Sequence, residues 1–274
     1  MNDYMALIIV GSLLLASIAV ATTGNTNQIS VSINQEAKGN CITGNVYIDQ
    51  ETSAVNNVQG NNNYVSQHID AYVDNNGITG AKNLPASITQ ICRIVGNVTG
   101  NNNHLEQSTK ANLRNNSIFE SSISQRTTQI AEICGSYNNV YQTATVNSNN
   151  NQLTLSSLSQ LAYFKASCLI GNHNWLSQQG SQSANRSYLV SSTSSQVTKV
   201  NATVFGSLNK VDQRANMSSN GAKLTSAKEY QEILENTSIL GNSNTVMHNL
   251  TLNASNNKLT GASLIQKANR TSNI

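Results

Sequence analysis

One unit recurs seven times along this chain of 274 residues, and the recurrence limits the fold more than any other feature. Each copy opens with the pattern Gly-x-x-Asn-x-aliphatic, and successive glycines are separated by 36, 40, 35, 36, 35 and 35 residues. The longest interval contains an extra AKNLP around Pro85, which predicts a loop insertion. The copies begin at Gly24, Gly60, Gly100, Gly135, Gly171, Gly206 and Gly241.

The first half of the unit contains two invariant positions and one frequent one. Three residues after the glycine every copy has asparagine, and two residues later every copy has an aliphatic side chain. The asparagines are Asn27, Asn63, Asn103, Asn138, Asn174, Asn209 and Asn244. Two residues beyond the aliphatic, five copies have glutamine, at Gln67, Gln107, Gln142, Gln178 and Gln213.

The second half of the unit repeats as well. Eighteen residues after the glycine, every copy has isoleucine or leucine, at Ile42, Ile78, Ile118, Leu153, Leu189, Leu224 and Leu259. Two residues before this position five copies have asparagine, and one residue after it five copies have threonine. Twenty-five residues after the glycine, the last five copies have glutamine, at Gln125, Gln160, Gln196, Gln231 and Gln266.

Within a unit the apolar positions recur at every second residue, as in VYQTATV over 140–146. This period is typical of a strand with one buried and one solvated face, and Asn, Gly and Ser separate about three such segments per unit. Helical repeats of similar length are disfavoured because no stripe with a period of 3.6 residues is present. The sequence therefore predicts an all-β fold, a β-solenoid of seven rungs of about 35 residues.

The composition fits stacked rungs. Asn, Ser, Thr and Gln number 43, 35, 23 and 19, which is 120 of 274 residues, whereas only 11% are charged. In a solenoid, equivalent residues lie about 4.8 Å apart on successive rungs, so amide side chains can hydrogen-bond along a column, whereas like charges in register would repel. We therefore expect Asn and Gln ladders along the stack.

The unit resembles the curlin repeat, as seen in GSYNNVYQ, GSLNKVDQ and GNNNYVSQ. Curlin subunits are secreted proteins whose strand–loop–strand units polymerise into extracellular amyloid fibres, although their units are near 22 residues and their Gln is spaced farther from the aliphatic. The resemblance implies a secreted, self-assembling structural protein. Secreted sheath proteins of methanogenic archaea provide a looser analogy.

The N-terminal segment predicts export. Residues 6–21 form an uncharged apolar run that ends in Ala-Val-Ala, a cleavage pattern, so we expect a signal peptide over 1–21 and the solenoid over 22–274. A retained anchor is the alternative. Four cysteines fit an oxidising compartment, and Cys134 and Cys168 fall on adjacent rungs and the same face. A disulfide between them, free thiols and a bond to a neighbouring subunit all remain open.

Candidates for chemistry are few. Glu229, Glu232 and Glu235 form the one local concentration of acids, either an acid site or a solvated edge, and the four histidines share no offset. Tyr64, His104 and Trp175 share one outward offset, as a glycan-stacking platform or as incidental aromatics. We expect no enzymatic activity, no cofactor, no metal site and, at a net charge of +3, no nucleic-acid partner.

The ends predict the function. Neither end has an evident capping segment, and uncapped rungs present unpaired strand edges, which are templates for a further copy. We therefore expect a secreted structural subunit that assembles head-to-tail into an extracellular or cell-surface amyloid-like fibre or sheath. Its partner would be itself, together with any nucleator or cell-surface anchor. The alternative is a monomeric β-solenoid adhesin or glycan-binding module.

Overall fold

The computed structural model describes residues 12–26, 28–38, 41–43, 47–74, 76–79 and 86–273, and all regular elements in these ranges are β-strands. The strands pair in parallel across successive repeats, each with the strand one repeat away. The molecule is thus a parallel β-solenoid of about seven turns, which confirms the predicted fold and the spacing of about 35 residues. No helix in the described part of the chain is long and apolar enough to span a membrane.

Three sheets run the length of the stack. Sheet A consists of β1 (Ser12–Thr23), β4 (Tyr47–Gln59), β7 (Ala86–Thr99), β10 (Ser121–Cys134), β13 (Ser157–Ile170), β16 (Thr193–Phe205), β19 (Lys228–Leu240) and β22 (Ser263–Asn273). Sheet B consists of β2 (Gln28–Lys38), β5 (Tyr64–Asp74), β8 (His104–Arg114), β11 (Asn139–Asn149), β14 (Trp175–Ser183), β17 (Lys210–Ser218) and β20 (Thr245–Asn253). Sheet C consists of β3 (Cys41–Thr43), β6 (Gly77–Thr79), β9 (Ser117–Phe119), β12 (Gln152–Thr154), β15 (Tyr188–Val190), β18 (Lys223–Thr225) and β21 (Lys258–Thr260).

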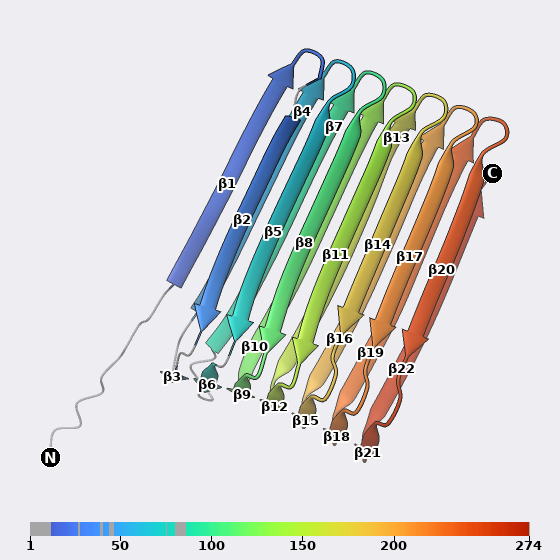
Figure 1. Ribbon diagram of the computed structural model, residues 1–274. Coiled ribbons are helices and arrows are strands. Elements are labelled where there is room, and N and C mark those ends of the chain that lie inside the picture. The colour runs from blue at the N-terminus through green and yellow to red at the C-terminus, as the bar shows by residue number, and fades with distance from the viewer. Residues whose placement is uncertain are drawn as a thin grey trace, which may run out of the picture.

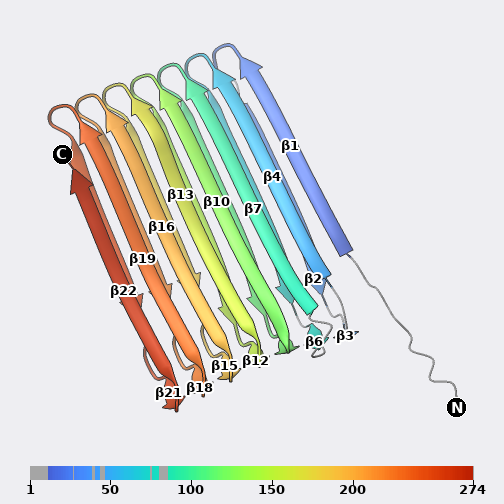
Figure 2. The same cartoon turned by 180° about the vertical axis from the view of Figure 1, so that it is seen from behind.

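Sheets A and B are two long layers that lie face to face (Figure 1). The Gly-x-x-Asn turns connect them along one side, and the short sheet C closes the opposite side. The reverse view shows sheet A in front, with β1 at one end of the stack and β22 at the other (Figure 2). Each rung therefore contains one strand from each sheet.

The period of two places apolar residues in the space between the layers. Along β11 the exposure alternates strictly, and Val140, Gln142, Ala144 and Val146 are buried. Because the register is kept from rung to rung, these positions form continuous inner stripes, as with Val140 opposite Leu105 on one side and Leu176 on the other. Burial of these stripes at about 25 cal/mol per Å² is the main driving force for stacking.

Facing residues of the two layers compensate each other in volume and polarity. Phe164 of β13 is fully buried and needs space, and Gly180 of β14 provides it, because a methyl group there would lie 2.9 Å from the Phe164 ring. One rung earlier, Gln129 donates a hydrogen bond across the core to the Thr109 hydroxyl at 2.9 Å. The contacts in the interior therefore differ from one rung to the next, beyond the shared repeat.

The repeat glycine is fixed by a close approach between rungs. Gly135 has a φ of 139°, and a side chain on it would overlap the carbonyl group of Gly100 on the preceding rung. The same overlap recurs at the other repeat glycines from Gly60 to Gly241. Any L-residue would therefore combine backbone strain with a steric collision.

The apolar N-terminal segment adds a strand to the stack. Residues 12–23 form β1, which pairs with β4 over its whole length in parallel register. The predicted signal peptide over 1–21 thus overlaps β1, and its first eleven residues lie outside the described ranges. Cleavage after Ala21 remains a prediction.

Candidate assembly interface

A glutamine ladder runs along the inner face of sheet A through all seven rungs. Each Nε2 donates to Oε1 of the preceding glutamine, at 2.6–2.9 Å. The members are Gln50, Gln90, Gln125, Gln160, Gln196, Gln231 and Gln266. The common offset of 25 residues from the glycine predicts the last five but not Gln50 and Gln90, which lie 26 and 30 residues after their glycines.

The predicted glutamines of sheet B form a second ladder of the same direction. Gln142 donates to Gln107 and accepts from Gln178, both at 2.8 Å. The ladder includes Gln67 and Gln213 at its two ends. Burial of these amides is tolerated because the column satisfies them.

The repeat asparagine clamps each rung onto the one before it. Asn138 accepts the backbone N–H of Asn103 at 2.8 Å and donates Nδ2 to the carbonyl of Gly100 at 3.0 Å. Both bonds reach back to the preceding turn, which explains why asparagine is present in every copy. Equivalent bonds are made by Asn174, Asn209 and Asn244, Asn103 accepts from Asn63, and Asn27 lies outside the described residues.

A further ladder follows the residue after each glycine, which sequence analysis did not identify. The backbone N–H of Asn61 donates to Oδ1 of Asn25 at 2.8 Å, and Asn101 donates in the same way to Asn61. Serine replaces asparagine in two rungs and still accepts through Oγ. This column is not apparent in the sequence because its residue type alternates between Asn and Ser. Both residue types can accept a hydrogen bond at turns.

The aliphatic column of sheet C is buried until the last rung. Ile118, Leu153, Leu189 and Leu224 are at most 2% exposed, whereas Leu259 is 47% exposed. The side chains of Ile42 and Ile78, at the same position, lie outside the described residues. The difference at Leu259 arises because β21 is the last strand of sheet C in the described residues, so no strand covers it there.

The last described rung thus has an exposed edge. Within the described chain, no strand pairs with the outer edges of β20, β21 and β22. Val246, Leu250 and Leu252 of β20 point toward the core but stay partly exposed, as their equivalents on earlier rungs do not. This end presents apolar stripes and unpaired backbone groups together, which is the arrangement that another strand set would cover.

The three clustered glutamates do not converge. Glu229 and Glu235 face the interior at 2% and 3% exposure, whereas Glu232 is on the outer face of β19. The expectation of a shared solvated edge is therefore wrong for two of the three. Glu229 accepts from Ser219 Oγ at 2.8 Å, and Glu235 contacts His248 Nδ1 at 2.8 Å. Burial raises the pKa of both carboxyl groups to about 7.

Glu229 provides a pH-dependence that can be tested. Its pKa in the fold exceeds the ordinary value of 4.5, so its stabilising contribution is complete below pH 4.5 and is lost as the pH rises through about 7. We expect Glu229→Gln to match the wild type at pH 4.5 and to exceed it at pH 8 by on the order of 2–3 kcal/mol in free energy of unfolding. Urea unfolding at a series of pH values measures this, with Glu232→Gln as the control. An equal pH slope in wild type and Glu229→Gln would contradict it.

The predicted aromatic residues lie in one row on the outer face of sheet B, and neighbouring rings contact each other along it. Tyr64 and His104 are stacked at 4.8 Å with an interplanar angle of 8°. Tyr141 continues the row to Trp175, and Lys210 Nζ lies 5.1 Å from the Trp175 ring. Tyr141 and Trp175 meet edge to face at 63°, and binding of a glycan to this row stays a prediction.

The two cysteine side chains that the structure describes form no bond between rungs. Cys134 is a free, exposed thiol, and the strand register sets it opposite Ile170. The side chain of Cys168 lies outside the described residues, so the proposed pairing with Cys134 stays a prediction. Cys92 is free and buried in the core.

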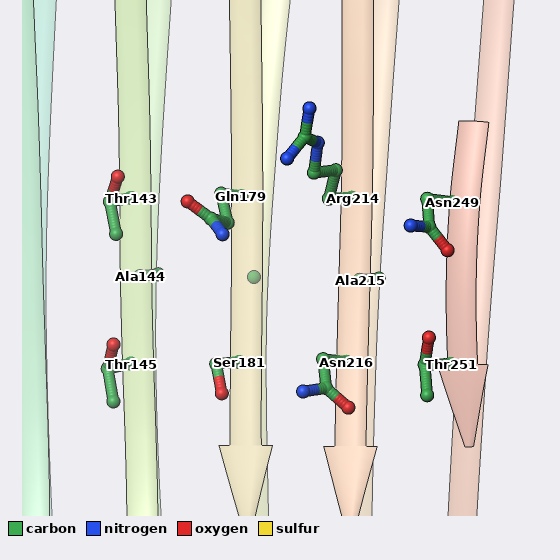
Figure 3. Close-up of a pocket in the computed structure, with 11 residues that line it drawn as sticks. Thr143, Ala144, Thr145, Gln179, Ser181, Arg214, Ala215, Asn216, Asn249 and Thr251 are labelled. Atoms are coloured by element: carbon green, nitrogen blue, oxygen red, sulfur yellow. The ribbon is translucent and has the colours of Figure 1, made fainter. Parts of the chain in front are cut away.

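A shallow polar trough of about 410 Å³ lies on the outer face of sheet B (Figure 3). It separates two rows of side chains that cross β11, β14, β17 and β20, and its described lining residues include no carboxylate, histidine or thiol. Arg214, its one charged residue, is held by Asp212 at 2.7 Å. In the described ranges no group of three or more His, Cys, Asp or Glu is arranged to hold a metal ion.

Comparison with protein-family models, curated proteins and solved structures finds no match to this chain. The fold and its ladders define the class by themselves. The protein is a β-solenoid repeat protein with Asn and Gln ladders, in which the hydrogen bonds of every rung point to the rungs on either side.

Proposed function

We propose that this protein is a secreted, curlin-like structural subunit that assembles head-to-tail into an extracellular fibre or sheath, each copy continuing the solenoid of the one before. The observation that carries the proposal is the exposed edge of the last described rung, where Leu259 is 47% exposed and β20, β21 and β22 have no partner on their outer side in the described chain. Such an edge pairs readily with strands of another copy.

The direction of the ladders supports head-to-tail rather than end-to-end contact between like ends. In sheet A every Nε2 donates toward the N-terminal rungs, so Gln266 offers an acceptor Oε1 at the C-terminal end. At the N-terminal end Gln50 Nε2 has only a long contact of 3.4 Å to the carbonyl of Tyr72. A donor and an acceptor are thus left at opposite ends, which only a head-to-tail joint brings together.

The secreted protein is expected to form filaments that give a cross-β reflection at about 4.7–4.8 Å along the filament axis. Leu250→Asp should abolish this growth, raising the minimum concentration for assembly by at least about tenfold, because the joint would bury an unpaired carboxylate. Electron microscopy and sedimentation at increasing concentration measure the effect.

Asn249→Asp is the matched control, since Asn249 is on the exposed outer face of the same strand. It should assemble as the wild type does. Circular dichroism of dispersed Leu250→Asp should still show the β-solenoid, because Leu250 is only partly buried within one copy. Secreted wild-type protein that stays monomeric at high concentration, or Leu250→Asp filaments at the wild-type threshold, would overturn the proposal.

A further inference from the structure

The edge of β4 that a preceding copy would need is already occupied. Sheet A has eight strands where sheets B and C have seven, and the extra strand is β1. β1 pairs with β4 from Ser12 opposite Ile48 to Thr23 opposite Gln59. Continuing the solenoid from another copy would place β22 of that copy at this same edge.

β1 complements the edge of β4 less well than β22 of a second copy would. The register sets Leu14 opposite Gln50, so the glutamine ladder has no amide to continue it. In every other pairing of sheet A from β4 to β22, glutamine is opposite glutamine, as with Gln231 and Gln266. A β22 strand in the same column would bring Gln266 to Gln50.

One pair of opposite charges on the outer face meets in that register. β4 contains Glu51 and β22 contains Lys267, whereas β1 contains no charged residue. With Gln266 opposite Gln50, Lys267 lies opposite Glu51, and both positions are exposed on the outer face. Opposite charges directly across a sheet stabilise the pair, whereas a joint between two β22 edges would bring like charges together.

The position of the predicted cleavage fits an exchange of strands. Hydrolysis of the Ala21–Thr22 peptide bond by a leader peptidase consumes one water and leaves a carboxylate on Ala21 and an ammonium group on Thr22. This cut removes Ser12–Ala21, which is all of β1 except Thr22 and Thr23, and it leaves the turn at Gly24 with the solenoid. Afterwards each of the three sheets has one strand per repeat.

We infer that β1 is a removable occupant of the β4 edge, and that leader cleavage opens this edge to β22 of a second copy in the register that sets Gln266 against Gln50 and Lys267 against Glu51. The inference rests on the proposed head-to-tail assembly. It adds which strands meet at the contact between copies and which cleavage permits that contact. The uncleaved chain is then blocked at its N-terminal end, which prevents growth before export.

Elongation of fragmented filament seeds tests the block. Seeds of secreted protein are mixed with secreted protein, with full chain that retains its leader, or with full chain carrying Ser17→Pro and Ile18→Pro. Because alternate N–H groups of β1 face β4, two adjacent prolines remove at least one ladder bond. The retained leader should slow elongation at least about tenfold, and the proline pair should restore much of the rate.

The matched control is Ser17→Ala with Ile18→Ala, which keeps the backbone bonds and should stay slow. Circular dichroism verifies that each full chain is folded. Equal rates for secreted protein and full chain would overturn this inference while leaving the proposed function in place. Secreted protein that fails to elongate its own seeds would overturn both.

Cross-linking tests the register of the joint. Ser53 and Asn269 are outer-face positions that share a column in this register, and neighbouring strands lie about 4.8 Å apart, within the range for a disulfide. Filaments of Ser53→Cys with Asn269→Cys should give covalent chains on oxidation, above the background of the parent protein. Ser53→Cys with Ile265→Cys, displaced by roughly 13 Å, should not. Equal yields would overturn the register.

Discussion

Gly135→Ala is expected to lower the free energy of unfolding by about 3–5 kcal/mol. The added carbon would lie 2.6 Å from the carbonyl carbon of Gly100, closer still to its oxygen, and 3.2 Å from Asn101 Oδ1. The φ of 139° adds strain of its own. Since both colliding groups are backbone or hydrogen-bonded, the rungs must separate locally, which weakens the Asn103–Asn138 clamp next to the turn.

Gly221→Ala distinguishes the effect of steric overlap between rungs from the effect of backbone strain at positive φ. Gly221 also has positive φ, at 68°, but a methyl group there meets only Arg186 Cγ at 3.7 Å. We expect a loss of about 1 kcal/mol at this position. Denaturant unfolding followed by circular dichroism compares the two variants. A similar loss for both would show that backbone strain alone, and not contact between rungs, requires the repeat glycine.

Gln142→Leu is expected to cost about 2–4 kcal/mol, although leucine is more apolar and of similar size. Gln142 is 1% exposed and is bonded to glutamines on both sides. The substitution leaves Gln107 Oε1 without its donor, and Gln178 Nε2 keeps only the bond to the Asn201 carbonyl at 3.3 Å. A broken column buries polar atoms that water cannot reach.

Gln152→Leu is the matched control, because Gln152 is exposed on β12. It should change the free energy of unfolding by no more than about 0.5 kcal/mol. Urea unfolding at pH 7 measures both variants against the wild type. If Gln142→Leu were as stable as Gln152→Leu, the ladder would contribute no more than apolar packing does.

The rung-to-rung register was predictable because residues of the same type recur at the same offset in successive repeats. The Gly, Asn and aliphatic positions at the turn fix which residue lies on which, and Gln178 and Gln213 meet as their common offset predicts. The ladder of sheet A extends further than predicted, since counting from the glycine misplaces Gln50 and Gln90 in the two units with altered spacing. Counting backward from the next glycine recovers both, because Gln50 and Gln90 lie ten residues before Gly60 and Gly100, the same separation as between Gln125 and Gly135.

The packing between the two layers was not predictable in the same way. The alternation on β19 sets Glu229 and Glu235 on the face of Gln231, so their inward direction was readable, but their partners Ser219 and His248 come from sheet B or its turn. Likewise no periodicity tells that Gly180 faces Phe164. Contacts across the core depend on how the layers are offset, which a single repeat does not encode.

The uniform direction of the glutamine ladders gives the molecule a net electric dipole along the axis of the stack. Each side-chain amide is a dipole of about 3.5 D, and the seven in sheet A point the same way, so together they amount to roughly 25 D. The positive ends face the N-terminal rungs. Dipoles from copies joined in series would add along a filament, and two filaments lying side by side would attract each other most strongly when they run in opposite directions.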